Sequence, residues 1–161
     1  GAFDPTIEII EKSGMLAALE DQVQQRGKPI LGICVGMHLL ADGSDEGVRK
    51  GLSWIPGRVR EVDVTALKKP PYLPHMGWNS VTGVQEDELL AGVDLGHGFY
   101  FLHSYYFAAE RNEDVVATVS YGADFPCVVR RGHVVGAQFH PEKSHANGVR
   151  LLKNFVGMTS C

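Results

Sequence analysis

The sequence lacks a long apolar run, regularly spaced cysteines and any excess of basic residues. No stretch approaches about 18 uninterrupted apolar residues, so no membrane-spanning helix is expected, and the first residues do not read as a secretory signal. Three cysteines without regular spacing predict neither a disulfide framework nor a metal site, and they fit a reducing cytoplasm. A net charge of −4, with no basic run longer than a pair, argues against a general nucleic-acid binder.

What remains is the composition of one globular domain of 161 residues, 44% hydrophobic and 21% charged. Apolar residues at helical spacing predict helices before residue 27 and after residue 144, the latter with Val149, Leu152 and Phe155 on its core face. Strand-like patterns dominate between them, and residues 127–139 read as a hairpin. The pattern predicts an α/β fold with a mixed sheet in a single domain, residues 1–161.

Residues 29–40 form the stretch around which the chain is organised. An apolar run predicts a buried strand, and Gly32-x-Cys34-x-Gly36 predicts a sharp turn into a short helix, which is a nucleophile elbow with sulfur as the nucleophile. The two glycines would remove side chains that collide at the turn. A thiol at a helix start is favoured as thiolate, and the Val35 N–H would face a developing oxyanion. A buried structural cysteine is the alternative interpretation.

A second pattern, His140-Pro141-Glu142, follows an expected strand end. A cysteine nucleophile requires a base, and that base requires an acceptor that fixes its tautomer. His140 and Glu142 supply both if they fold against Cys34, with His38 as a reserve base. A structural histidine at a strand end, beside a carboxylate that complements a helix dipole, is the alternative.

Together these motifs resemble those of the class I glutamine amidotransferases. Longer strings narrow the resemblance to the glutaminase subunits of imidazole glycerol phosphate synthase, an enzyme of histidine biosynthesis, over essentially the whole chain. The resemblance implies a three-layer, flavodoxin-like α/β fold with a mixed, mostly parallel sheet, and a protein that uses no cofactor and no metal. The strings are Pro74-His75-Met76-Gly77-Trp78-Asn79, Phe99-Tyr100-Phe101-x-His103-Ser104-Tyr105 and Gln138-Phe139-His140-Pro141-Glu142-Lys143-Ser144.

The resemblance also implies a role for each residue of the site. Cys34 would attack the side-chain amide of L-glutamine, His140 would move the protons, and Glu142 would orient His140. The backbones of Val35 and Gly1 would form the oxyanion hole. Ammonia would pass to a (β/α)₈-barrel cyclase partner in a heterodimer, which would make imidazole glycerol phosphate and AICAR, an aminoimidazole-carboxamide ribonucleotide.

Other positions match binding surfaces of the family. Ser104 and Tyr105 match positions that contact the bound glutamine. Core packing is the alternative for the aromatic residues nearby. The positions that match the partner interface and the ammonia gate are Met76, Trp78, Asn79 and Tyr100.

The sequence departs from the family pattern at two places. His38 stands where the family has a glutamine that grips the substrate, and an imidazole cannot copy an amide's donor and acceptor together, although we still expect His38 to face the glutamine pocket. Gly1 matches the last glycine of a family loop, so the family's first strands are expected to be missing. Apolar surface on Ile30, Leu31 and Ile33 should then be exposed or covered otherwise, and the chain alone should be poorly stable and weakly active.

Three other functions stay open at this point. A paralogous amidotransferase would supply ammonia to another synthase, because the acceptor site belongs to the partner. A cysteine-dependent hydrolase on a similar elbow would leave the Pro-His-Met-Gly-Trp-Asn string unexplained. A catalytically impaired interaction subunit would fit His38 and the expected missing strands.

Overall fold

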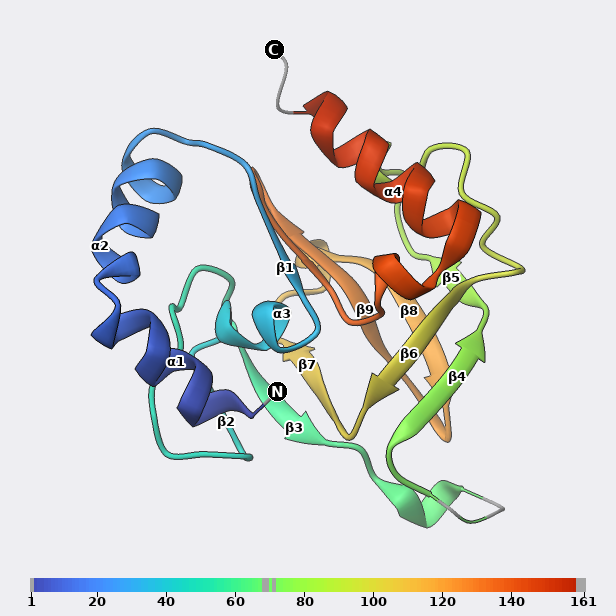
Figure 1. The fold of residues 1–161 in the computed structure, drawn as a ribbon. Coiled ribbons are helices and arrows are strands. Elements are labelled where there is room, and N and C mark those ends of the chain that lie inside the picture. The colour runs from blue at the N-terminus through green and yellow to red at the C-terminus, as the bar shows by residue number, and fades with distance from the viewer. Residues whose placement is uncertain (1, 68–69, 71, 159–161) are drawn as a thin grey trace.

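The computed structural model describes residues 2–67, 70 and 72–158. In Figure 1, α1 and α2 lie on one side of the molecule and α4 on the other, with the strands between them. No helix in these described ranges is long and apolar enough to cross a membrane. The helices are α1 (Phe3–Lys12), α2 (Met15–Leu19), the π-helix η1 (Glu20–Gln25), α3 (Val35–Leu39), α4 (His145–Met158), and the 3₁₀ turns η2 (Val64–Ala66), η3 (Glu88–Leu90), η4 (Asn112–Asp114) and η5 (Pro141–Lys143).

The strands form separate sheets. The five-stranded sheet has the order β1-β10-β9-β8-β5, a three-stranded sheet has the order β2-β3-β7, and β4 pairs with β6. The strands are β1 (Ile30–Ile33), β2 (Gly43–Ser44), β3 (Gly57–Glu61), β4 (His75–Asn79), β5 (Val81–Gly83), β6 (Phe99–His103), β7 (Tyr105–Ala109), β8 (Val115–Tyr121), β9 (Ala123–Arg131) and β10 (Val134–Ala137).

The expectation of a mostly parallel sheet is wrong. Only β1 with β10 and β2 with β3 pair in parallel among the described strands, while the other pairs are antiparallel. A parallel pair needs a long crossover, usually a helix, whereas antiparallel strands need only a tight turn. The turns from β8 to β9 and from β9 to β10 contain Gly122 (φ 78°) and Gly132 (φ 59°), in the left-handed conformation that glycine adopts without strain.

Two clusters of buried apolar side chains form the core. The larger one includes Phe99, Phe101 and Phe139, and it extends to Leu151 on α4. The second joins Phe3 of α1 to residues of α3, β3 and β7. The helix α3, which follows the elbow, belongs to the second cluster, while β10, which precedes the His-Pro-Glu segment, contributes residues to both clusters.

The predicted core face of the last helix is wrong. In α4 the buried residues are Asn147, Gly148 and Leu151, whereas Val149 is 54% exposed and Leu152 is 37% exposed. Only Phe155 packs partly against the larger cluster, as expected. The Asn147 side-chain amide donates hydrogen bonds to the carbonyls of Asp94 and Gly98, both at 2.7 Å. These bonds hold the face of α4 that carries Asn147 against the rest of the protein.

Strand β1 lies at the end of the five-stranded sheet, and β10 is its one strand neighbour among the described residues. Ile30, Leu31 and Ile33 are half-buried, so this part of the strand is neither fully covered nor fully exposed. The parallel register Ile33↔Ala137 brings the carboxyl ends of β1 and β10 together. The segments that follow the two strands, which begin at Cys34 and at Gln138, therefore lie at the same edge of the sheet.

Candidate functional site

The elbow forms as the sequence predicts. Cys34 directly follows β1 with φ 51° and ψ −111°, a strained conformation for a side-chain-bearing residue, and α3 begins at the next residue. The Cys34 N–H donates to the Ala137 carbonyl at 2.8 Å, while its own carbonyl accepts from the N–H groups of Met37 (2.9 Å) and His38 (3.2 Å). These bonds hold the strained turn between the sheet and the helix.

The two glycines of the motif have different roles. A Cβ at Gly32 would overlap the Gly36 carbonyl oxygen and would lie 2.6 Å from the Gly36 carbonyl carbon and 2.9 Å from the Met37 nitrogen. The turn therefore requires glycine at position 32, as expected. A Cβ at Gly36 would meet no atom within 4 Å, so the predicted collision there is wrong.

His140 and Glu142 meet as predicted. A carboxylate oxygen only accepts, so the His140 Nδ1–H donates to Glu142 Oε1 at 2.7 Å. In the neutral form, a ring bonded in this way carries its lone pair on Nε2. That Nε2 is buried and has no hydrogen-bond partner in the described part of the chain. Backbone hydrogen bonds fix the segment, since His140 N–H donates to the Tyr100 carbonyl at 2.9 Å.

Cys34 and His140 both lie just beyond the carboxyl ends of the parallel pair β1 and β10, and no direct hydrogen bond joins them. Within the described residues, the Cys34 thiol donates to the Leu102 carbonyl at 3.9 Å and accepts from Gln138 Nε2 at 4.0 Å. Burial raises the pKa of the Cys34 thiol, and the negative charge of Glu142 adds to this rise. Catalytic hydrogen bonds are often long without substrate and shorten in the complex.

A cavity of about 240 Å³ opens at the Cys34 thiol. Five of the residues predicted from the sequence line it: Cys34, Val35, His38, Ser104 and Tyr105. The other lining residues are Glu46, Pro74, Leu102 and His103. The cavity therefore gathers the predicted nucleophile and the predicted substrate-binding positions, while Gly1 lies outside the described residues.

Glu46 is a polar residue of this cavity that sequence reasoning missed. Its region, residues 42–51, reads as a polar surface loop, yet β2 pairs with β3 and brings the loop against the elbow. The Phe3 N–H donates to Glu46 Oε2 at 3.0 Å and orients the carboxylate. Nothing local in the sequence signals this position, because its approach to Cys34 depends on strand pairing.

The environment of the cavity favours the neutral forms of the Cys34 thiol and the His38 ring. Burial raises the pKa of the Cys34 thiol, and the carboxylates of Glu142 and Glu46 raise it further, against the lowering by the Val35 backbone N–H. The N–H group at the helix start favours the thiolate, as expected, but burial outweighs it. Burial also lowers the pKa of His38 to about 4, so that this ring is neutral near pH 7.

The predicted interface positions divide between the two faces of β4. Met76 (63% exposed) and Trp78 (41% exposed) lie on the outer face, and Tyr100 pairs with Trp78 across the β4–β6 ladder. Asn79 lies on the other face, as strand alternation requires, and its amide donates to the Ser120 carbonyl at 3.0 Å. The expectation that Asn79 shares the exposed patch is therefore wrong.

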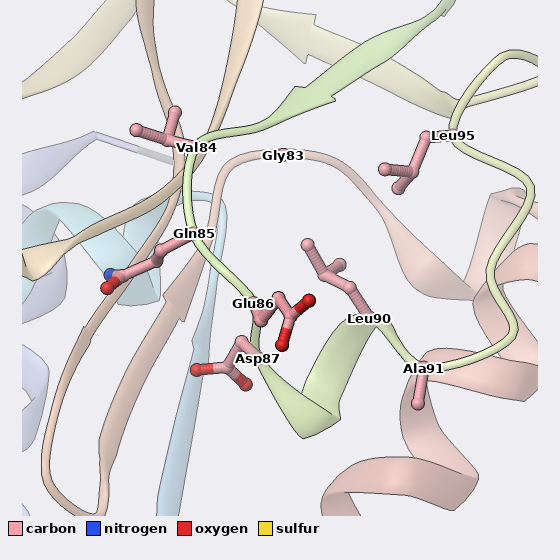
Figure 2. Close-up of a pocket in the computed structure, with 8 residues that line it drawn as sticks. All are labelled: Gly83, Val84, Gln85, Glu86, Asp87, Leu90, Ala91 and Leu95. Atoms are coloured by element: carbon pink, nitrogen blue, oxygen red, sulfur yellow. The ribbon is translucent and has the colours of Figure 1, made fainter.

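A larger cavity, of about 440 Å³, lies near η3 and is unrelated to Cys34. Figure 2 shows Val84, Leu90 and Leu95 around it, with the carboxylates of Glu86 and Asp87 at one side. Asp87 already accepts hydrogen bonds from Arg130 at 2.9 and 3.1 Å. Among the described residues, no cysteine, serine or histidine lines this cavity, so the smaller cavity at Cys34 is the candidate site.

Comparison with known proteins agrees with this geometry. The family described as "Glutamine amidotransferase class-I" matches residues 9–158. The chain is 43% identical over 158 residues to imidazole glycerol phosphate synthase subunit HisH of Leptospira interrogans, which covers 98% of this chain and 78% of that protein. It is 48% identical over 155 residues to the subunit of the same name from Bdellovibrio bacteriovorus, covering 96% and 76%.

Solved structures show the same fold. A crystal structure of a glutamine amidotransferase from Thermotoga maritima superposes with a TM-score of 0.62 at 19% identity, covering 98% of this chain and 57% of that one. A second glutamine amidotransferase structure also gives a TM-score of 0.62, covering 96% and 72%. The α/β fold, the matched family residues and the HisH relatives agree: this chain belongs to the class I glutamine amidotransferase family and resembles its HisH subunits.

Proposed function

We propose that this chain is the glutaminase subunit of an imidazole glycerol phosphate synthase and that Cys34, His140 and Glu142 form its catalytic triad. The observation that carries the proposal is the buried Nε2 of His140, which has no hydrogen-bond partner among the described residues and lies at the same edge of the sheet as the elbow cysteine. Because Glu142 holds the Nδ1 proton, this Nε2 is the ring's proton acceptor. The triad thus has a base with its tautomer already set.

The reaction follows from these groups. His140 Nε2 takes the Cys34 thiol proton, and the sulfur attacks the side-chain carbonyl carbon of glutamine to give a tetrahedral oxyanion facing the Val35 N–H. When the C–N bond breaks, the imidazolium returns its proton to the departing ammonia and a glutamyl thioester remains. His140 then takes a proton from water, whose oxygen attacks the thioester and releases glutamate and the thiol.

The lining of the cavity fits the amino-acid end of glutamine. The Glu46 carboxylate, held by the Phe3 N–H, supplies a negative charge for the substrate ammonium. Ser104 and Tyr105 supply hydroxyl groups for its polar atoms. We propose that His38 contacts this end of the substrate as well, in place of the family's glutamine.

The exposed face of β4 would bind the partner. Met76 and Trp78 project from the strand whose first residue, His75, pairs with His103 in the wall of the cavity. An exposed tryptophan beside a methionine is typical of protein interfaces. We propose that a (β/α)₈-barrel cyclase covers this face, takes up the ammonia and completes a heterodimer that acts in the cytoplasm.

A catalytically impaired interaction subunit is the second candidate. The raised pKa of Cys34 and the absence of a Cys34–His140 hydrogen bond among the described contacts favour it. Ammonia release from glutamine, measured with and without the barrel partner, separates the two functions. We expect Cys34→Ala to abolish release and Cys127→Ala, at a buried cysteine outside the site, to retain it. No release from the parent chain in the complex would favour the impaired subunit.

A further inference from the structure

Three side chains, those of His38, Gln138 and Cys34, follow one another in a line of polar contacts that ends at the proposed nucleophile. His38 Nε2 lies 2.8 Å from Gln138 Oε1, and Gln138 Nε2 lies 4.0 Å from Cys34 Sγ. Gln138 is fully buried and His38 is 5% exposed. Gln138 immediately follows β10, where its N–H donates to the Cys127 carbonyl at 2.8 Å, so its backbone is fixed independently of the side chain.

The directions of these hydrogen bonds follow from chemistry. An amide oxygen only accepts, so the His38 ring must donate through Nε2–H, and a neutral ring then has its lone pair on Nδ1. Burial lowers the pKa of His38 to about 4, which keeps this neutral tautomer at physiological pH. With its oxygen held by His38, the Gln138 amide must turn its NH₂ group toward the sulfur.

An N–H donor beside the Cys34 sulfur favours the thiolate, whereas the nearby carboxylates disfavour it. Burial raises the pKa of the thiol, and the carboxylates of Glu142, in η5, and of Glu46, in the loop after β2, raise it further. His103 of β6 is buried and neutral, with a pKa lowered to about 3, and His140 precedes η5. The Val35 backbone N–H favours the thiolate, and the amide of Gln138, which follows the neighbouring strand β10, supplies a second donor.

We propose that Gln138 is a catalytic residue that stabilises the Cys34 thiolate through an N–H···S⁻ hydrogen bond, and that His38 is the positioning residue that sets the direction of its amide. The proposal rests on the assignment of Cys34 as the nucleophile of the proposed glutaminase. It gives His38 a role beyond substrate contact. A hydrogen bond to a charged group is stronger than one to a neutral group, so the gain appears when the thiol ionises.

The test measures the pH dependence of Cys34 alkylation by iodoacetamide in the full chain, with mass spectrometry to assign the modified cysteine. Gln138→Leu should raise the apparent pKa by about one unit, which makes alkylation at pH 7 about tenfold slower. Gln85→Leu is the matched control, because this amide binds the carbonyls of Glu113 and Val115 and not the thiol, and its alkylation profile should equal the parent's.

Position 38 offers a second pair of variants. His38→Leu removes the donor to Gln138 and should slow alkylation at pH 7 about threefold, since the amide is then no longer oriented. His38→Gln keeps an N–H donor at the position of Nε2 and should restore the parental profile. This pair keeps the proposal testable if Gln138→Leu does not fold.

The possible outcomes separate this proposal from the proposed function. Alkylation needs no glutamine, so an inactive glutaminase can still show the shifted profiles. An unchanged apparent pKa in folded Gln138→Leu, or equal profiles for His38→Leu and His38→Gln, would overturn the proposal even in an active enzyme. A higher apparent pKa of Cys34 alkylation in both Gln138→Leu and His38→Leu, together with the parental profile in His38→Gln, would support the proposal.

Discussion

Gly148 is the point where α4 packs against the segment that carries the proposed base. A Cβ at this position would overlap the Pro141 carbonyl oxygen and would lie 2.7 Å from the carbonyl carbon and 3.1 Å from Cα of the same residue. All of these atoms belong to the backbone of η5, next to His140 and Glu142. Gly148→Ala must therefore move η5 or α4, because no flexible side chain can give way.

The magnitude follows from two opposed effects. Replacing glycine by alanine inside a helix stabilises it by about 0.5–1 kcal/mol. Overpacking of a tight contact costs about 1–3 kcal/mol, and backbone atoms place this contact at the upper end. We expect Gly148→Ala to lower the free energy of unfolding by about 1–2 kcal/mol, which lowers the melting temperature by about 3–6 °C. A shift of about 1 Å in a catalytic group can lower the rate about 100-fold.

The assay compares Gly148→Ala with Gly157→Ala by thermal unfolding and by ammonia release. A Cβ at Gly157, on the same helix, would meet no atom within 4 Å, so this variant should melt at or slightly above the parent's temperature and keep its rate. If Gly148→Ala melts as high as Gly157→Ala and hydrolyses glutamine equally fast, α4 does not position η5 as described.

Three further predictions concern binding, coupling and pH. In steady-state kinetics, His38→Gln should lower the KM for glutamine more than it changes kcat; an unchanged KM would show that His38 does not contact the substrate. Trp78→Ala should uncouple glutamine hydrolysis from product formation in the complex more than it slows hydrolysis, whereas equal losses in the two assays would exclude an interface role. The pKa of buried His38 is lowered to about 4 and that of buried His103 to about 3, so both contribute stability above pH 6.5 that is lost as the pH falls toward 4. Chemical unfolding at pH 7 and pH 5 should show this loss, which His103→Gln should reduce; equal stability at both pH values would contradict it.

Local patterns predicted the geometry of the elbow and of the His-Pro-Glu segment well. The apolar run predicts a strand, and Gly32-x-Cys34 predicts a sharp turn after it. Both form, because the backbone strain at Cys34 and the close approach of Gly32 to Gly36 involve residues that are near in sequence. The His140–Glu142 hydrogen bond also forms between residues two apart. Such features depend on short-range chemistry, which the sequence records directly.

Features that depend on distant partners were missed. Glu46 reaches the cavity only because β2 pairs with β3, and the face of α4 is set by Asn147 bonding to Gly98. The alternation that turns Asn79 inward becomes visible only when the bounds of β4 are known. The mostly parallel sheet was wrong because strand order is a long-range property that periodicity does not contain.

The central claim is that Cys34 is the nucleophile of a glutamine-specific site. Its most direct test is mass spectrometry after treatment with an electrophilic analogue of glutamine, in which a reactive carbon replaces the side-chain amide. We predict one covalent adduct, located on Cys34 and prevented by excess glutamine, with buried Cys127 unmodified. An unmodified Cys34, or an adduct that glutamine does not prevent, would contradict the assignment of this cavity as a glutaminase site.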